Sequence, residues 1–207
     1  MSAAHRDTPD PARFPGLARY LAQLDDGLAA YPECTCKASL YRSWIDAHDL
    51  SRDRDGLPSA MVELIDMPEP VNAWMPSVFY NAFCLAVIDR FYKDGAAAAR
   101  WNHASRLEMF RSPLYRVLMV VMSPARILSG ARRRWENFHR GFDFELEHTD
   151  TSADFSLLYP PRLHNVDTIG IIVSGVCAAL TAAGAKDIRW RVPELTETRA
   201  RAEARWG

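Results

Sequence analysis

The chain has 207 residues, of which 48% are hydrophobic, 25% are charged and 11% are aromatic. This composition excludes a disordered chain, a collagen-like repeat and a small disulfide-rich protein. Its 25 lysines and arginines and 26 aspartates and glutamates give a formal net charge of −1. Because nucleic acids and anionic membranes select proteins with a basic excess, this balance offers no case for either partner.

Two segments bear on targeting. The first eleven residues are polar, are broken by prolines and lack the apolar stretch of a signal peptide, so we expect residues 1–13 to form a flexible tail. The longest uncharged run, residues 168–185, is rich in Gly, Ser, Ala and Thr and is bounded by charges. These features favour a buried helix over a membrane span.

The chain contains four cysteines, Cys34, Cys36, Cys84 and Cys177. In the absence of a secretory signal we expect free thiols and a cytoplasmic protein. A structural zinc site needs four ligands, and no second closely spaced cysteine pair complements Cys34 and Cys36. The role of these two cysteines stays open.

Up to about residue 141 the apolar residues recur at intervals of three and four, which is the period of amphipathic helices. The spacing predicts helices over residues 15–28, 37–49, 58–65, 77–92, 95–111 and 113–122, with a non-helical, proline-containing linker over 68–76. The helix at 77–92 is apolar enough to be central. The last helix of this helical part is predicted to begin at Pro124, with Ser123 as its N-cap, and to end at Gly141.

After residue 141 apolar and polar residues largely alternate, which is typical of strands with one buried face. The alternation predicts a hairpin over 142–159, a buried helix over 166–183, and two further strands at 186–192 and 199–206. We therefore expect one α+β domain over residues 14–207. Its helical part, 14–141, would pack on a small antiparallel sheet with the order β-β-α-β-β, formed by residues 142–207.

The charges on these predicted strands segregate. Asp143, Glu145 and Glu147 lie on the first strand, whereas the last two strands carry mostly arginines. If the first strand neighbours the third or the fourth, its carboxylates would pair with arginines across the sheet. Such pairing specifies strand order, which makes the three carboxylates poor catalytic candidates.

Several short motifs, taken in order, resemble a known family. They are YPEC at 31–34, KASL at 37–40, LYR at 114–116, SPAR at 123–126, Trp135 with FHRG at 138–141, GAKD at 184–187 and the final Arg205-Trp206. The chain resembles an uncharacterised myxobacterial paralogue family of similar length. That family is itself similar to vinyl-reductase and haem-NO-binding domains and to trafficking-complex subunits.

The resemblance implies a fold more than a function, because the family has no assigned activity. It implies helices packed on a small antiparallel sheet around an apolar pocket, as in vinyl-reductase and haem-NO-binding domains. Some members of the wider group hold haem, others hold acyl chains or other small apolar ligands, and many act as dimers or as sensory parts of larger proteins.

The residues argue against haem. The Tyr-x-Ser-x-Arg signature of haem-NO-binding domains is matched only by Tyr41 and Ser43, because Ile45 occupies the arginine position. The motif also precedes His103, the candidate axial ligand if haem were bound. We expect no cofactor and no metal, since no two histidines share the helical spacing of metal ligands.

No nucleophile-elbow, P-loop or dinucleotide glycine motif is present, so the sequence gives no positive sign of an enzyme. An enzyme that uses His139 and Asp143, with Arg140, is the weaker alternative. The densest local charge is basic and can bind an acidic group or partner through guanidinium contacts, although a solvated helix face is the favoured explanation. This predicted patch comprises Arg132, Arg133, Arg134, His139 and Arg140.

Large apolar residues are the candidates for a ligand pocket between the helices and the sheet, and an ordinary core is the alternative. They are Phe83, Val87, Trp101, Tyr115, Leu118, Met119, Met122, Trp135 and Phe155. We therefore predict a non-enzymatic cytoplasmic sensor or regulatory domain that binds a small apolar molecule there. The alternative is a protein interaction module that acts as a homodimer without a ligand.

Overall fold

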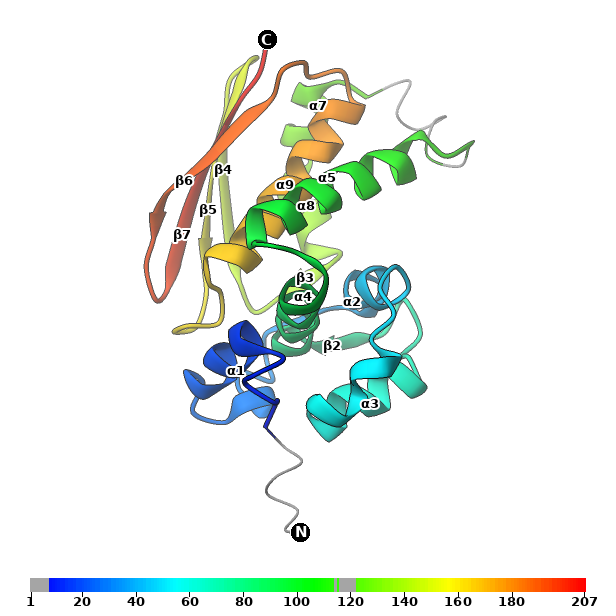
Figure 1. Ribbon diagram of the computed structural model, residues 1–207. Helices are drawn as coiled ribbons and strands as arrows, with labels where there is room; N and C mark the ends of the chain where they lie inside the picture. Colours follow the sequence, from blue (N-terminus) through cyan, green and yellow to red (C-terminus); the bar gives the residue numbers. More distant parts are fainter. Residues whose placement is uncertain (1–7, 114, 116–121) are drawn as a thin grey trace. The chain divides into compact units, whose positions relative to one another are not determined.

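The computed structural model describes residues 8–113, 115 and 122–207, which form two compact units (Figure 1). Unit 1 comprises the described residues up to Asp94 together with Phe138–Gly141. Unit 2 comprises the described residues of Gly95–Asn137 together with Phe142–Gly207. The predicted boundary between a helical and a sheet part at residue 141 differs from this division, because the helices after Gly95 group with the C-terminal strands.

Unit 1 is mainly helical and contains three short strands. Its elements are α1 (Pro15–Ala22), the 3-10 helix η2 (Gly27–Ala29), β1 (Thr35–Lys37), α2 (Ala38–Ile45), the 3-10 helix η3 (Ser51–Gly56), α3 (Ser59–Asp66), β2 (Trp74–Pro76), α4 (Ser77–Phe91) and β3 (His139–Arg140). The central position predicted for 77–92 is confirmed, since α4 is buried on almost every side and α1 and α2 pack against it. A helix that is apolar all round needs such cover.

The three strands of unit 1 form an antiparallel sheet in the order β2-β1-β3. Cys36 pairs with Met75 on one side and with His139 on the other. The prediction of one helix from 124 to 141 is therefore wrong, because His139 and Arg140 belong to a strand. Gly141 does not cap a helix; its φ of +78° forms the turn after β3, where a Cβ atom would lie 2.7 Å from the carbonyl oxygen of Glu33.

The remainder of the predicted helix is divided in two. It forms α7 (Pro124–Ser129) and α8 (Ala131–Glu136), separated at Gly130. Glycine is a poor helix former and ends the first segment here. The predicted N-cap is confirmed, because the Ser123 hydroxyl accepts a hydrogen bond from the backbone N–H of Arg126 and Pro124 occupies the first turn.

Unit 2 packs helices on a four-stranded antiparallel sheet, and Figure 1 shows α9 beside α5. Its further elements are α5 (Gly95–Arg111), β4 (Asp143–His148), β5 (Ser152–Leu158), α9 (Val166–Ala182), β6 (Arg189–Leu195) and β7 (Arg199–Arg205). The predicted hairpin is present as β4 and β5. Among the described residues no helix is long and apolar enough to cross a membrane.

The strand order β4-β5-β7-β6 corrects the expected charge pairing. Asp143, Glu145 and Glu147 lie on an edge strand, opposite Leu158, Ser156 and Asp154, and so they face no arginine across the sheet. The arginines pair within the other strands instead: Arg201 contacts Asp154 at 2.9 Å, and Arg191 contacts Glu203 at 2.6 Å. Exposed charges on an edge strand discourage pairing with another chain.

Residues 8–13 were expected within the flexible tail, but they are attached to unit 1. The backbone N–H of Asp10 donates to the carbonyl oxygen of Gly56 at 2.8 Å. Arg13 forms ion pairs with Asp53, which is buried, and with Asp55. Residues that precede α1 are therefore part of unit 1.

Candidate functional site

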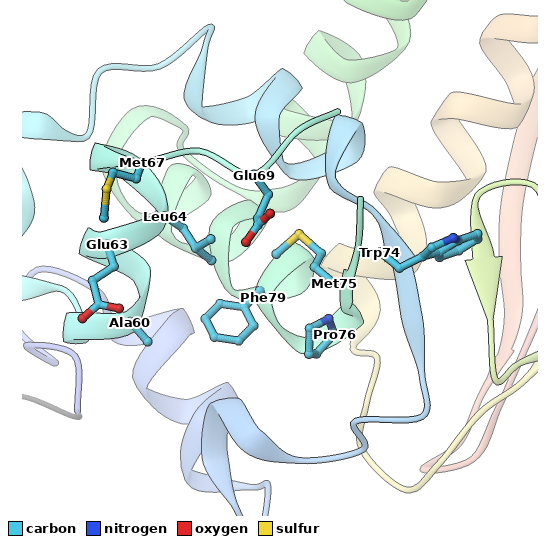
Figure 2. A pocket seen from close by; sticks show the side chains of 9 residues that line it. All are labelled: Ala60, Glu63, Leu64, Met67, Glu69, Trp74, Met75, Pro76 and Phe79. Atoms are coloured by element: carbon cyan, nitrogen blue, oxygen red, sulfur yellow. The ribbon is translucent and has the colours of Figure 1, made fainter. Parts of the chain in front are cut away.

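A cavity of about 500 Å³ lies in unit 1 between α3, β2 and the first turn of α4 (Figure 2). This volume falls within the range of small-molecule sites in proteins. The lining residues are Ala60, Glu63, Leu64, Met67, Glu69, Trp74, Met75, Pro76 and Phe79.

One wall is a single face of α3. Ala60, Glu63, Leu64 and Met67 are spaced at i, i+3, i+4 and i+7, which places them on one side of a helix and just past its end. The adjacent Met61 is fully buried and anchors the helix in unit 1. The lining face of α3 can thus stay open to a ligand while the neighbouring side of the helix, which carries Met61, holds it in place.

The second wall comes from β2 and α4. Met75 is buried and faces the same side of the sheet as its pairing partner Cys36. Pro76 leads directly into α4, so that Phe79 lies in the first turn of that helix and is half-buried at the cavity. Figure 2 shows Phe79, Met75 and Leu64 gathered around the cavity.

The segment between the two walls is fixed through its backbone. The N–H of Glu69 donates to the Tyr41 hydroxyl at 2.8 Å, and Arg42 donates to the Glu69 carbonyl oxygen at 3.3 Å. Tyr41 is itself buried and stacks on Phe83 with ring centroids 5.1 Å apart. Burial raises the pKa of Tyr41, so its hydroxyl keeps its proton and remains a fixed partner for Glu69.

Two cations lie over Trp74. The Lys37 ammonium is 4.0 Å from the centre of a Trp74 ring, and the Arg140 guanidinium carbon is 3.8 Å from one. Lys37 also donates to the carbonyl oxygen of Asn72 at 2.6 Å. The ring quadrupole attracts both cations, and the carbonyl oxygen additionally holds Lys37 beside Trp74.

Among the described residues that line the cavity, Glu63 and Glu69 are the charged ones. Both residues are exposed, and within the described part of the chain neither carboxylate forms an ion pair. The cavity therefore combines an apolar wall with two carboxylates that are not neutralised by a neighbouring side chain.

Of the nine residues predicted for the pocket, those that the structure describes do not line this cavity. Phe83 and Val87 are fully buried in α4 of unit 1. The other described candidates belong to unit 2, where Phe155 is buried and Trp101, Tyr115, Met122 and Trp135 are half-buried. Leu118 and Met119 lie outside the described residues.

Trp135 illustrates what these aromatic residues do in unit 2. Its ring stacks on Phe144 with centroids 5.0 Å apart, and Phe144 in turn lies 6.4 Å from Phe155. This row covers the apolar side of the sheet and is part of the core. Sequence reasoning missed the cavity because it selected large apolar residues, whereas the α3 face mixes Ala, Glu, Leu and Met.

The predicted basic patch is divided between the units. Arg132 forms an ion pair with Glu136 at 3.4 Å, and Arg134 donates to the Ile127 carbonyl oxygen of α7 at 2.7 Å. Both belong with Arg133 to α8 of unit 2, whereas His139 and Arg140 belong to β3 of unit 1. The expected single helix face therefore does not exist. The two residues of the enzyme alternative, His139 and Asp143, likewise belong to different units.

All four cysteines are free and buried. Cys34 donates to the carbonyl oxygen of Gly141 at 3.1 Å. Burial raises the pKa of Cys34 to about 11 and that of Cys36 to about 12, so both stay protonated and are weak nucleophiles and metal ligands. Across the described ranges no group of three or more His, Cys, Asp and Glu side chains is arranged to hold a metal ion.

Two places could hold haem in principle: the surroundings of His103 and the cavity of unit 1. His103 lies on α5 with its Nε2 atom 3.4 Å from the Thr181 hydroxyl of α9, so its imidazole faces a packed helix. Among the described residues that line the cavity of unit 1 there is no His, Cys or Tyr, and its two carboxylates would repel haem propionates. Neither place fits haem.

No family model matches the chain, and no curated protein matches it in sequence. Among solved structures, the Fe(II) unliganded H-NOX protein from K. algicida is 10% identical, with a TM-score of 0.48 over 83% of this chain and 96% of that chain. A protein in which heme distortion was probed in the H-NOX family is 8% identical, with a TM-score of 0.50 over 82% of this chain and 92% of that chain.

A third structure, described as modulating heme redox potential through protein-induced porphyrin distortion, is 6% identical, with a TM-score of 0.46 over 96% of this chain and 100% of that chain. Of these three structures, we base an argument only on the one with a TM-score of 0.50. Because its sequence identity is 8%, that argument concerns the fold and not the function. The predicted mixture of helices and antiparallel sheet, similar to haem-NO-binding domains, is thus confirmed at the level of the fold, and membership of the myxobacterial family stays a prediction.

Proposed function

We propose that the chain is a cytoplasmic sensor or regulatory domain, and not an enzyme, which binds a small apolar ligand in the cavity of unit 1. The observation that carries this proposal is the cavity of about 500 Å³ between α3, β2 and α4. Its lining of Leu64, Met67, Met75 and Phe79 suits an apolar molecule, and methionine side chains adapt to ligands of different shape. The ligand differs from haem, because the residues do not fit that group.

The likeness to an H-NOX structure supports the choice of a sensor only as context, because a fold hosts many functions. We also propose, from the sequence resemblance, that the fold is similar to that of vinyl-reductase domains. The cavity is not the pocket predicted from the sequence. We therefore propose the same function at a different site.

Filling the cavity tests this proposal. Ala60 is half-buried on the α3 face, and Ala60→Phe places a ring in the space that a ligand would use. We expect the wild-type chain to bind a neutral apolar dye such as Nile red, measured by its fluorescence, and Ala60→Phe to weaken binding at least about tenfold, which is about 1.4 kcal/mol.

The matched control is Ala104→Phe, which makes the same substitution at an exposed position of α5 in unit 2. It should bind the dye as the wild-type chain does. Equal binding by wild type and Ala60→Phe, or no binding by the wild type, contradicts the proposal.

A homodimer is the second candidate, and exposed aromatic residues of unit 1 favour it. Phe91 is 44% exposed and Phe138 is 45% exposed. Burial of such rings is a common source of interface stability. Sedimentation velocity at high protein concentration should then show a dimer that Phe91→Ser and Phe138→Ser weaken, and a monomer at all concentrations rejects this candidate.

A further inference from the structure

We infer that the ligand of this cavity is a small cationic amphiphile: an amine on an apolar chain, with its ammonium group at Glu69 and Glu63. This inference rests on the proposed function and adds the chemical class of the ligand. It follows from three features of unit 1: the apolar walls, the fixed backbone of Glu69, and the contacts that Lys37 and Arg140 make with other groups.

The apolar walls hold the chain of the ligand. Leu64 and Phe79 are half-buried on the two walls of the cavity. Met75, a residue of β2, is buried. Contact with a ligand would remove the remaining exposed parts of Leu64 and Phe79 from water, which is favourable. Met67, which is 76% exposed, lies just past the end of α3 and can fold over a bound chain.

Glu69 is positioned before any ligand arrives. Its N–H donates to the Tyr41 hydroxyl and its carbonyl oxygen accepts from Arg42, so the peptide groups on both sides of its Cα atom are held. In Figure 2 its carboxylate points towards the space between Leu64 and Met75. The fixed backbone keeps this carboxylate beside the apolar wall, where it can accept a charge-assisted hydrogen bond from an ammonium group.

The nearby cations do not compete for these carboxylates. Lys37 is held by Asn72 and Trp74, and Arg140 lies over Trp74. Arg42 donates to the backbone carbonyl oxygen of Glu69 at 3.3 Å and forms an ion pair with Asp46 at 3.9 Å. Among the described residues Asp66, on the same helix as Glu63, is paired with Arg54. Glu63 and Glu69 therefore present negative charge to the cavity, which attracts a cation and repels an anion.

A series of three ligands with the same chain tests the inference. Octylamine, octanol and octanoate differ only in the head group, and each is titrated below its micelle concentration by calorimetry into the full chain. We expect octylamine to bind about tenfold more tightly than octanol, since a charged hydrogen bond contributes of that order. Octanoate should bind more weakly than octanol.

Variants separate the head group from the chain. Glu69→Gln should reduce octylamine to the affinity of octanol and leave octanol unchanged, and Glu63→Gln should have the same effect to a smaller extent. The control Glu108→Gln removes an exposed carboxylate of α5 in unit 2 and should change nothing. Ala60→Phe should weaken all three ligands.

The outcomes distinguish this inference from the proposed function. Equal affinity for octylamine and octanol, or tightest binding of octanoate, overturns the inference while binding of an apolar chain stands. An octylamine preference that survives both glutamine variants also overturns it, because the charge then comes from elsewhere. If none of the three ligands binds, both the inference and the proposed function fail.

Discussion

His164 is a buried imidazole in unit 2, 7% exposed, between Tyr159 and Phe142. Its Nδ1 atom lies 3.3 Å from the Thr168 hydroxyl, and the Tyr159 ring meets it edge-on with centroids 4.9 Å apart. Burial lowers the pKa of His164 to about 3, because the charged imidazolium would lose its hydration. The folded chain therefore resists protonation of this residue.

Acid should therefore lower the stability of the folded chain through His164. The unfolded chain takes up a proton near the ordinary pKa of about 6.5, whereas the folded chain does not until about pH 3, so protons favour unfolding between these values. We expect His164 alone to remove up to about 1.4 kcal/mol of unfolding free energy per pH unit below about pH 6. Urea denaturation of wild type and His164→Gln at pH 7 and pH 5 measures the difference.

The variant should be less stable at pH 7 but should lose less stability on acidification than the wild type. His148→Gln is the control, because His148 is exposed at the end of β4. A pH dependence of stability identical in wild type and His164→Gln would show that this imidazole is not kept neutral by the fold.

At the scale of elements, α1 depends on a residue of α4 for its N-terminal cap. Its own N-cap residue, Phe14, offers no side-chain hydrogen bond. The Asp89 carboxylate instead accepts from the N–H groups of Gly16 at 2.9 Å and Leu17 at 3.0 Å. A Cβ atom on Gly16 would lie 2.8 Å from an Asp89 oxygen, so this close approach requires glycine.

Removing this cap should weaken the attachment of α1. We expect Asp89→Ala to lower the free energy of unfolding by about 1–2 kcal/mol, because two backbone donors lose their partner and the helix dipole loses a compensating charge. Asp89→Asn should cost less, since its amide oxygen can still accept a hydrogen bond. Chemical denaturation gives the totals, and hydrogen exchange of the α1 amides locates the effect; unchanged exchange in Asp89→Ala would refute it.

Long periodic elements could be predicted from the sequence, and short ones could not. The apolar run of α4 and the alternation in β4 and β5 extend over enough residues to define a period. β1, β2 and β3 have two or three residues each, and their existence depends on pairing partners far away in the chain. The cavity could not be predicted for the same reason, because Glu69 and Phe79 line one cavity only once β2 and α3 have folded.

At the scale of the whole molecule, a fold similar to that of an H-NOX structure is combined with residues that do not fit haem. We expect the chain, after incubation with excess haem and desalting, to show no stoichiometric Soret absorbance, and His103→Ala to behave identically. The reason is that His103 faces Thr181 between two packed helices. A Soret band that His103→Ala abolishes would contradict this and restore the haem hypothesis.

The pairing of β1 with β3 also bears on how the chain is made. During synthesis Thr35 and Cys36 leave the ribosome long before Arg140 and His139, with much of unit 2 in between. One edge of β1 in unit 1 therefore stays unpaired until His139 and Arg140 have also left the ribosome. An unpaired strand edge invites pairing with a neighbouring chain, so nascent chains of this protein are most vulnerable to aggregation during that interval.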